Sequence, residues 1–343
     1  MSEIANLRLK AVGQTLFSQT TQKKAIQKLG FVQADPIRSP ARAQDLVLRH
    51  RVKGYKVGDL EKYYTSLDIE EDFLYAHGFV RRDIWQLLHP REISRLTEFD
   101  KKVLGKVREL GKIHPKDLSA HFKEKREINW WGGHSNATKM SLDRLHYYGY
   151  LRIAGRKNGI RLYEPLYPDK NPLPISKRLE QIILAVVNIL SPVTEKTLHA
   201  SLHRIRRQFG HTKPTIIKML KEGSLLAQKV DGITYIFKNG THHESRIGAK
   251  FLAPFDPIVW DRPRFEHLWG WQYRFEAYTP KEKRIRGYYA MPLLWKDSVI
   301  GWANVDRDGK AEIGYVKGEP KDKNFKEELE KEIEAMKAFL TST

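Results

Sequence analysis

The clearest structural pattern in this chain is a segment that reads NATKMSLDRLHYYGYLRIAGRKNGIRLY, residues 136–163. Met140, Leu142 and Leu145 have the spacing of one apolar helix face, and Gly149 is placed to end that helix. Asn158-Gly159 is a typical two-residue hairpin turn, and it lies here between two apolar strands. The segment therefore predicts a helix followed by a β-hairpin, which is the closing half of a winged helix.

A second copy of the pattern follows along the chain. The segment KPTIIKML (213–220) predicts a helix, Gly223 ends it, and Asp231-Gly232 turns one strand into the next. Each copy is preceded by two shorter helical patterns, at 99–110 and 115–122 for the first copy and at 177–190 and 194–202 for the second. Three helices and a hairpin, found twice, predict two winged-helix modules. Two unrelated helix-hairpin units remain the alternative.

The N-terminal region carries an unusual polar pair in the segment FVQADPI (31–37). Side chains alternate along a strand, so Gln33 and Asp35 are expected on one face. Polar groups in an apolar strand cost burial energy unless they are satisfied or face a site of chemistry. Thr20 or Thr21 is expected to cap a helix that ends at Leu29-Gly30, and residues 46–52 predict another helix. A third, degenerate winged helix is the expected fold of this region.

The last hundred residues change character. Short strands are predicted at 274–278, 287–291, 298–304 and 311–316, and an amphipathic helix at 326–340. The fold class is therefore α+β, with three tandem winged-helix modules before a small C-terminal β domain that ends in a helix. A proline-rich linker occupies residues 164–174. The expected domains are 1–90, 91–170, 171–243 and 244–343.

The charge balance points to a polyanionic partner. The 343 residues include 61 Lys and Arg against 41 Asp and Glu, which gives a net charge of +20. Such an excess favours nucleic acid, although a charged, generally solvated surface is the plainer interpretation. The chain has no cysteine, which excludes disulfides and thiolate zinc sites. It shows no signal peptide and no membrane-spanning segment, so a cytoplasmic, nucleoid-associated protein is expected.

Motifs for cofactor-dependent chemistry are missing from the sequence. It contains no GxGxxG, no P-loop, no HExxH and no GxSxG. His199 and His203 are four residues apart on a predicted helix, but no third ligand stands nearby, so surface or packing roles are favoured. We expect neither a metal nor a cofactor.

Basic side chains cluster around the predicted modules, where they suit contacts with DNA phosphates. Four arginines follow the polar pair within fourteen residues. A second motif, FLAPFDPIVWDR (251–262), is either a shaped loop of the site or a packed domain junction. The predicted DNA contacts are Arg38, Arg42, Arg49, Arg51, Lys139, Arg144, Arg156, Lys157, Arg206, Arg207, Lys213, Trp260 and Arg262.

Taken together, these residues resemble the bacterial DNA glycosylases of the YcaQ/AlkZ type, which unhook interstrand crosslinks and excise alkylated purines. The resemblance rests on Gln33-Ala34-Asp35 with Arg42-Ala43 and residues 46–48 after it, on residues 255–262, and on Gly287-Tyr288-Tyr289. It covers most of the chain, and it implies three tandem winged helices and a C-terminal β domain. The chain departs from many relatives at Gln44, where a histidine is usual.

The resemblance also implies which residues act. The family's catalytic signature, Gln, an apolar residue, then Gln or Asp, corresponds to Gln33 and Asp35, and its Asp form is that of the YcaQ branch. Asp35 would stabilise an oxocarbenium-like sugar and act as general base, while Gln33 would hold the water. The expected substrate is double-stranded DNA with alkylated or crosslinked purines, and the expected enzyme is a monomeric, monofunctional glycosylase.

Two other classes of protein fit parts of the sequence. A non-enzymatic winged-helix regulator explains the charge and the repeated modules, and only the Gln33/Asp35 pair argues against it. An RNA-binding or scaffold protein would use the aromatic residues of the C-terminal domain as a stacking surface. Those residues are Trp269, Trp271, Tyr273 and Phe275.

Overall fold

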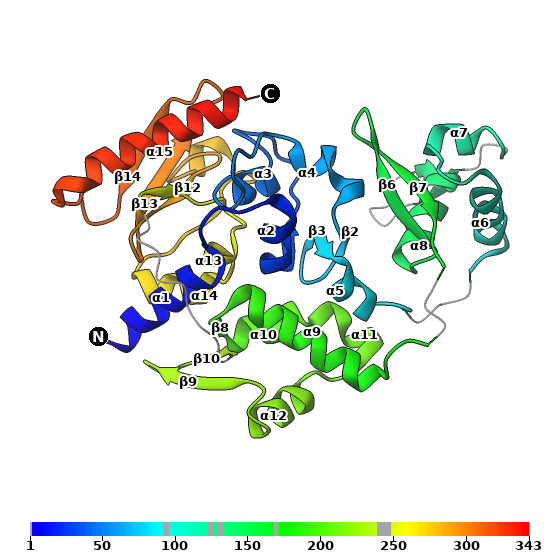
Figure 1. Cartoon of the computed structure of the whole chain (residues 1–343), viewed down its shortest axis with the longest axis horizontal. Helices are drawn as coiled ribbons and strands as arrows, with labels where there is room; N and C mark the ends of the chain where they lie inside the picture. Colours follow the sequence, from blue (N-terminus) through cyan, green and yellow to red (C-terminus); the bar gives the residue numbers. More distant parts are fainter. Residues whose placement is uncertain are drawn as a thin grey trace.

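The computed structural model describes residues 2–91, 96–122, 126–128, 134–167, 171–238 and 248–342. Helices and small antiparallel sheets alternate along the chain, which confirms the α+β class. Figure 1 shows an N-terminal unit at the centre, a second unit to its right, a third below and the C-terminal sheet at the upper left. Within the described residues, no helix is long and apolar enough to cross a membrane.

The first unit is built around a three-stranded sheet in the order β1-β3-β2. The predicted helix before it is present, since Thr21 accepts from Lys24 N–H at the start of α2 and Gly30 ends that helix with φ +73°. The predicted helix at 46–52 is wrong in its bounds, because residues 51–53 exchange backbone hydrogen bonds with Thr20 instead. The elements are α2 (Gln22–Leu29), β1 (Phe31–Gln33), α3 (Ala43–Leu48), α4 (Asp59–Lys62), η1 (Tyr64–Ser66), β2 (Ile69–Phe73), β3 (His77–Arg81) and α5 (Arg82–Leu87).

The second unit contains the helix and hairpin predicted from residues 136–163. Asn136 caps the helix through its side-chain oxygen, and Asn158 and Gly159 turn the hairpin with φ +53° and +77°. Both values suit the type I′ turn that matches strand twist. Ile113 pairs with Tyr163, which adds a short bridge to the hairpin. The elements are α6 (Glu98–Leu110), α7 (Pro115–Ser119), β4 (Arg126–Ile128), β5 (His134–Asn136), α8 (Ala137–Tyr147), β6 (Leu151–Lys157) and β7 (Ile160–Pro165).

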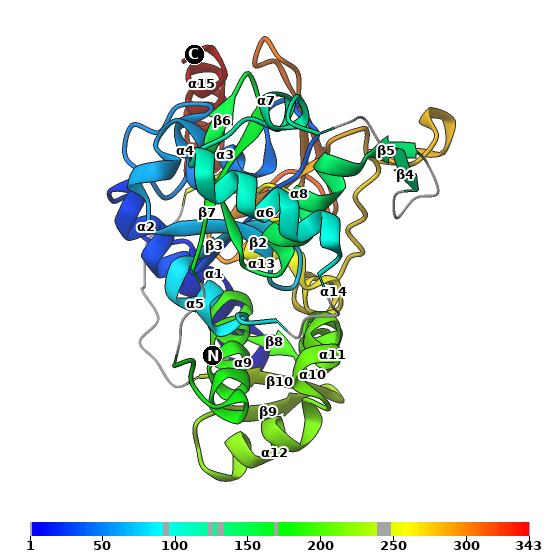
Figure 2. The ribbon, with the colours of Figure 1, turned by 90° about the vertical axis from the view of Figure 1, so that its right-hand side faces the viewer.

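The third unit repeats the sheet order of the first, as β8-β10-β9. In both, a short strand after the opening helix pairs with the last strand of a hairpin. Figure 2 shows this unit below the others, with α9 against α5. The predicted boundaries near 170 and 243 adjoin residues outside the described ranges. The elements are α9 (Ile175–Leu190), β8 (Val193–Thr194), α10 (Glu195–Ser201), η2 (His203–Ile205), α11 (Arg206–Phe209), α12 (Lys213–Lys221), β9 (Leu226–Val230) and β10 (Ile233–Phe237).

The C-terminal part is a four-stranded sheet in the order β11-β12-β13-β14, with α15 packed along it (Figure 1). The helix buries Phe325, Leu329, Met336 and Phe339. The elements are β11 (Lys250–Phe251), α13 (Pro257–Trp260), α14 (Arg262–Trp269), η3 (Lys281–Lys283), β12 (Met291–Trp295), β13 (Ser298–Val305), β14 (Ala311–Tyr315) and α15 (Lys323–Thr341).

The strand predicted at 274–278 is wrong, and that at 287–291 coincides with a strand only at Met291. The buried carboxylate of Glu276 accepts the backbone N–H groups of Ile285, Arg286 and Gly287, so it holds this segment as a loop. Helix α1 (Glu3–Thr15) was not predicted. It buries Leu7, Ala11 and Val12 against α13 and α14, far away in sequence.

Candidate functional site

The polar pair lies at the end of β1, beside the middle strand of the first sheet. Gln33 is the last residue of the strand and pairs with Gly78 of β3, and Ala34 N–H donates to His77 O at 3.0 Å. A Cβ at Gly78 would lie 2.4 Å from the Val32 carbonyl oxygen, so only glycine allows this close approach of the two strands. Gln33 and Asp35 are both half-buried, and strand alternation gives their side chains the same side.

The side chain of Gln33 has a fixed orientation. Its Oε1 accepts a 2.8 Å hydrogen bond from the indole Nε1–H of Trp260, at the end of α13. An indole N–H only donates, so the atom of Gln33 that faces it is the oxygen. The amide nitrogen, with two donors, is therefore turned away from Trp260. This contact joins the two motifs that the sequence singled out separately.

A buried ion pair fixes the start of the helix that ends at Trp260. Asp256 caps α13 by accepting from Ile258 N–H, and its two oxygens accept from both terminal nitrogens of Arg51 at 2.8 and 3.0 Å. Arg51 and Asp256 are both fully buried. The Trp260 ring also packs edge-on against Tyr75, with centroids 4.6 Å apart. Asp256 is thus committed to positioning the indole rather than to chemistry.

The rest of this motif joins it to the third unit. Asp261 caps α14 and accepts hydrogen bonds from Thr194 and Thr197. The buried guanidinium of Arg264 donates to the carbonyl oxygens of Leu190 and Pro192 and to two carbonyls of α13. The segment 251–262 is therefore the packed junction, one of its two sequence interpretations.

Asp35 is the uncommitted carboxylate of the site. Its Oδ1 accepts from Ile37 N–H at 2.9 Å in an Asx turn across Pro36, and its Oδ2 has no hydrogen-bond partner among the described residues. Burial raises the pKa of Asp35, and the Ile37 hydrogen bond opposes that rise. Among the described residues, no lysine or arginine forms an ion pair with it. A carboxylate with a raised pKa and no cation is suited to accept a proton.

A cluster of aromatic rings lies within electrostatic range of Asp35, and the sequence did not predict its arrangement. Phe275 packs against Phe255, Tyr289 and Tyr278, with centroids 5.0, 5.3 and 6.2 Å apart. Burial and then the negative charge of Asp35 raise the pKa of both Tyr278 and Tyr289, so these phenols lie within electrostatic range of the carboxylate. Tyr278 is 74% exposed, whereas Tyr289 is 3% exposed. In the sequence, the Gly287-Tyr288-Tyr289 motif pointed to one of these aromatic residues, Tyr289.

Gln44, the position of the expected histidine, is buried on α3, and its Oε1 has no hydrogen-bond partner among the described residues. The neighbouring Asp45 is also buried and accepts from the Tyr55 hydroxyl at 2.7 Å. Burial raises the pKa of Asp45 despite that bond.

The predicted DNA contacts differ in their exposure and in their partners. Arg49 and Arg51 are buried and paired with Glu332 and Asp256, so their predicted role as DNA contacts is wrong: neither guanidinium reaches the surface. Partly exposed cations have carboxylate partners, namely Arg42 with Glu61, Arg144 with Asp100, and Arg156 with Glu71. Arg262 donates to the carbonyls of Val259 and Pro254. The exposed members are Arg38, Lys139, Lys157, Arg206, Arg207 and Lys213.

The proposed stacking surface of an RNA-binding protein is also wrong. Trp269, Trp271 and Tyr273 are buried in a core cluster, and their polar atoms donate to the carbonyl oxygens of Asp297, Val299 and Ala290. His199 lies 3.8 Å from Glu195 on its own helix. In the part of the chain that the structure describes, no three His, Asp or Glu side chains are grouped to hold a metal.

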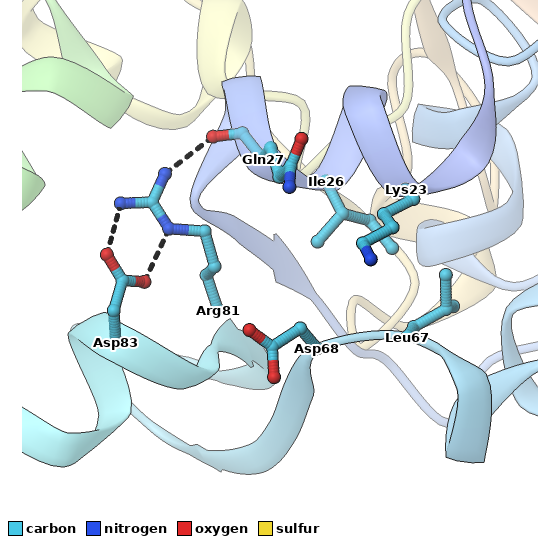
Figure 3. Close-up of a pocket in the computed structure, with 7 residues that line it drawn as sticks. All are labelled: Lys23, Ile26, Gln27, Leu67, Asp68, Arg81 and Asp83. Carbon is cyan, nitrogen blue, oxygen red and sulfur yellow. Dashed lines mark hydrogen bonds and ion pairs between the residues drawn. The ribbon is translucent and has the colours of Figure 1, made fainter.

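A cavity of about 390 Å³ opens at the far end of β3 from Gly78 (Figure 3). Arg81 there donates to both oxygens of Asp83 and to the carbonyl oxygen of Gln27. Asp68, on the same wall, pairs with Arg82. The Arg81–Asp83 and Asp68–Arg82 pairs neutralise one another, and Lys23 also lines the cavity without an ion-pair partner among the described residues.

Comparison with known proteins identifies the family of this chain and a solved structure of similar fold. A family model described as "DNA glycosylase AlkZ-like" matches residues 26–339. The solved structure of Streptomyces sahachiroi DNA glycosylase AlkZ is similar at a TM-score of 0.61 and 12% sequence identity. The match covers 99% of this chain and 97% of that one. At this identity the structural likeness shows the shared fold, while the family model covers most of the sequence.

Proposed function

Because this chain belongs to the AlkZ-like family of DNA glycosylases, enzymes of DNA repair, we propose that it hydrolyses the N-glycosidic bond of alkylated, positively charged purines in duplex DNA. Alkylation of the imidazole ring makes the base a good leaving group. The remaining demands are to stabilise a sugar cation and to supply water at its anomeric carbon. A carboxylate meets both demands.

In the proposed reaction the bond between C1′ and the purine nitrogen breaks, and its electron pair neutralises the base. The water oxygen bonds to C1′, and one water proton passes to the carboxylate of Asp35, which later releases it to solvent. The products are an abasic site and a neutral alkylated purine. The observation that carries this assignment is a half-buried carboxylate whose Oδ2 has no hydrogen-bond partner and no cation beside it in the described part of the chain.

Gln33 takes a narrower role than the sequence suggested. Its oxygen accepts from Trp260, so only the amide N–H donors remain for the site. These donors suit the lone pair of a water or an oxygen of the sugar-phosphate. The proton of the water must therefore go to Asp35. Gln33 positions the nucleophile, and Asp35 activates it.

Exposed cations on all three helix-hairpin units support a role in holding the duplex. We take these units as winged-helix modules, with domains 1–90, 91–170, 171–243 and 244–343 as expected from the sequence. The phosphate contacts would come from the exposed members of the basic set, which are Arg38, Lys139, Lys157, Arg206, Arg207 and Lys213.

Crosslinked purines are included in the proposed substrate range. A crosslinked base is tethered to the opposite strand, so it cannot be extruded into a closed pocket. Asp35 is half-buried, and Tyr278, which lies within electrostatic range of it, is 74% exposed. A partly exposed aspartate near an exposed ring suits a base that stays attached to the duplex.

The test is incubation of the protein with duplexes that carry a single N7-methylguanine, a nitrogen-mustard crosslink between guanines, or no lesion. Release of the free base and an alkali-labile site in the first duplex supports the proposed hydrolysis. Conversion of the crosslinked duplex to separable strands supports unhooking. Binding to all three duplexes without base release would leave a DNA-binding regulator and refute the proposal.

A further inference from the structure

Resting on the hydrolysis proposed above, we propose that Tyr289 is a third catalytic residue, whose hydroxyl binds the attacking water on the side opposite Gln33. In the sequence, Tyr289 stood out only as part of Gly287-Tyr288-Tyr289, one of the motifs that resemble the glycosylase family. Three observations assign it a role: its hydroxyl lacks a partner among the described residues, its ring is fixed, and its core cluster packs against Ala34 and Ile37, which flank Asp35.

The hydroxyl of Tyr289 is an exception among the buried tyrosines. The side chain is 3% exposed, and within the described residues its Oη has no hydrogen-bond partner. By contrast, Tyr273 Oη donates to Ala290 O at 2.7 Å, and Tyr235 Oη lies 2.6 Å from His267 Nδ1. Buried polar atoms are almost always paired, because an unpaired one keeps its full desolvation cost. The free hydroxyl therefore marks a place for a bound molecule.

The loop that carries Tyr289 is held rigidly. The carboxylate of Glu276 accepts the N–H groups of residues 285–287. Gly287 follows with φ +116°, and a Cβ there would lie 2.5 Å from the side chain of Asn304. The ring of Tyr289 then meets Phe275 edge-on at 5.3 Å. A hydroxyl on such a support needs little reorganisation when it binds its partner.

Asp35 lies within electrostatic range of this hydroxyl, because Ala34 and Ile37 pack against the core cluster that contains Tyr289. The carboxylate charge, after burial, raises the pKa of Tyr289, yet no hydrogen bond joins the two groups. Polar groups separated in this way are commonly bridged by water. One water would donate to Asp35 Oδ2 and to Tyr289 Oη, and it would accept from the Gln33 amide. Its last lone pair is then free to attack C1′, so all four positions of the water are assigned.

The test compares Tyr289→Phe with Tyr235→Phe, which removes a buried hydroxyl of the third unit that is paired with His267. Three quantities are measured for each: the single-turnover rate of N7-methylguanine release, the Kd for the lesion duplex, and the melting temperature. Tyr289→Phe is expected to lose about tenfold in rate, with its Kd and melting temperature unchanged or its melting temperature slightly raised. Tyr235→Phe is expected to melt earlier and to keep its rate.

The outcomes separate this inference from the function beneath it. If the parent releases the base and Tyr289→Phe releases it equally fast, Tyr289 has no catalytic role while the glycosylase stands. A lower melting temperature of Tyr289→Phe at an unchanged rate would likewise give the hydroxyl a structural role and overturn the inference. If the parent releases no base from any lesion duplex, both proposals fail.

Discussion

The indole N–H of Trp260 donates a 2.8 Å hydrogen bond to the side-chain oxygen of Gln33, across 227 positions of sequence. Trp260 stands on a short helix whose cap, Asp256, is locked to Arg51 of the first unit. The C-terminal part of the chain thus sets the orientation of an amide in the N-terminal unit. The two units act as one support for the site.

Replacing Trp260 with phenylalanine removes the donor and keeps a ring against Tyr75. The Gln33 amide would then be free to rotate, so its donors would no longer point reliably at the water. We expect the single-turnover rate of base release to fall about tenfold, the size of one hydrogen bond. DNA affinity should change little.

The control for this variant is Trp269→Phe, which removes an indole N–H that donates to Asp297 O. It should lower stability and leave the excision rate near that of the parent. Equal rates for Trp260→Phe and the parent would show that the Gln33 contact does not matter for catalysis.

Arg156 and Lys157 are neighbouring cations on the β6–β7 hairpin, and their substitution should affect different properties of the protein. Arg156 donates to Glu71 at 2.6 Å, and Glu71 is almost fully buried on β2 of the first unit. Arg156→Ala leaves that carboxylate with less support, so we expect a loss of about 1–2 kcal/mol in the free energy of unfolding. Urea unfolding at neutral pH measures it.

Lys157 is exposed at the tip of the same hairpin. Lys157→Ala should keep the stability of the parent and weaken duplex binding, and the slope of log K against log salt should shrink by about 0.9. If Arg156→Ala instead unfolds like the parent and weakens binding, the assignment of these two residues is reversed.

Stability should fall on mild acidification because the burial of His50 and His89, and the partial burial of His77 and His146, disfavours the charged form of these histidines. Burial lowers the pKa of His146 to about 4, and it also lowers the pKa values of His50, His77 and His89. Between pH 6.5 and 4 the unfolded chain binds protons that the folded chain does not, so stability is lost as pH falls through this window. From pH 7 to pH 5, His146 alone should cost about 1–2 kcal/mol.

Urea unfolding at pH 7 and pH 5 measures this loss, and His146→Gln provides the comparison. The difference between the two pH values should be smaller in the variant than in the parent. The same difference in both proteins would show that His146 is not the group responsible.

Much of the fold was predictable because its signals are local. Thr21 and Gly30 bound their helix, and Asn158-Gly159 turns its hairpin as the sequence indicated. The errors came where distant groups compete for the backbone. Glu276 holds residues 285–287 in a loop, and Thr20 forms backbone hydrogen bonds with Arg51 and Lys53 at the end of the predicted helix. These long-range contacts cannot be predicted from the neighbouring sequence.

The candidate site was predictable in part for the same reason. Alternation along a strand relates Gln33 to Asp35, since it needs only their spacing. The contacts of Trp260 depend on how separate units pack, and so does the lack of a hydrogen-bond partner for the Tyr289 hydroxyl among the described residues. Sequence spacing does not reveal such packing. The prediction that Arg49 and Arg51 contact DNA failed because both form buried ion pairs. The sequence alone does not distinguish an arginine on the surface from one in a buried ion pair.

The most direct test of the central claim is the single-turnover release of N7-methylguanine by the Asp35→Asn variant. The amide keeps the size of the side chain and its Asx turn but cannot accept the proton of the water. We predict a loss of at least about 100-fold in the release rate, with the duplex Kd and melting temperature close to those of the parent. Release at the parent rate would contradict the account, because the proton would then have another acceptor.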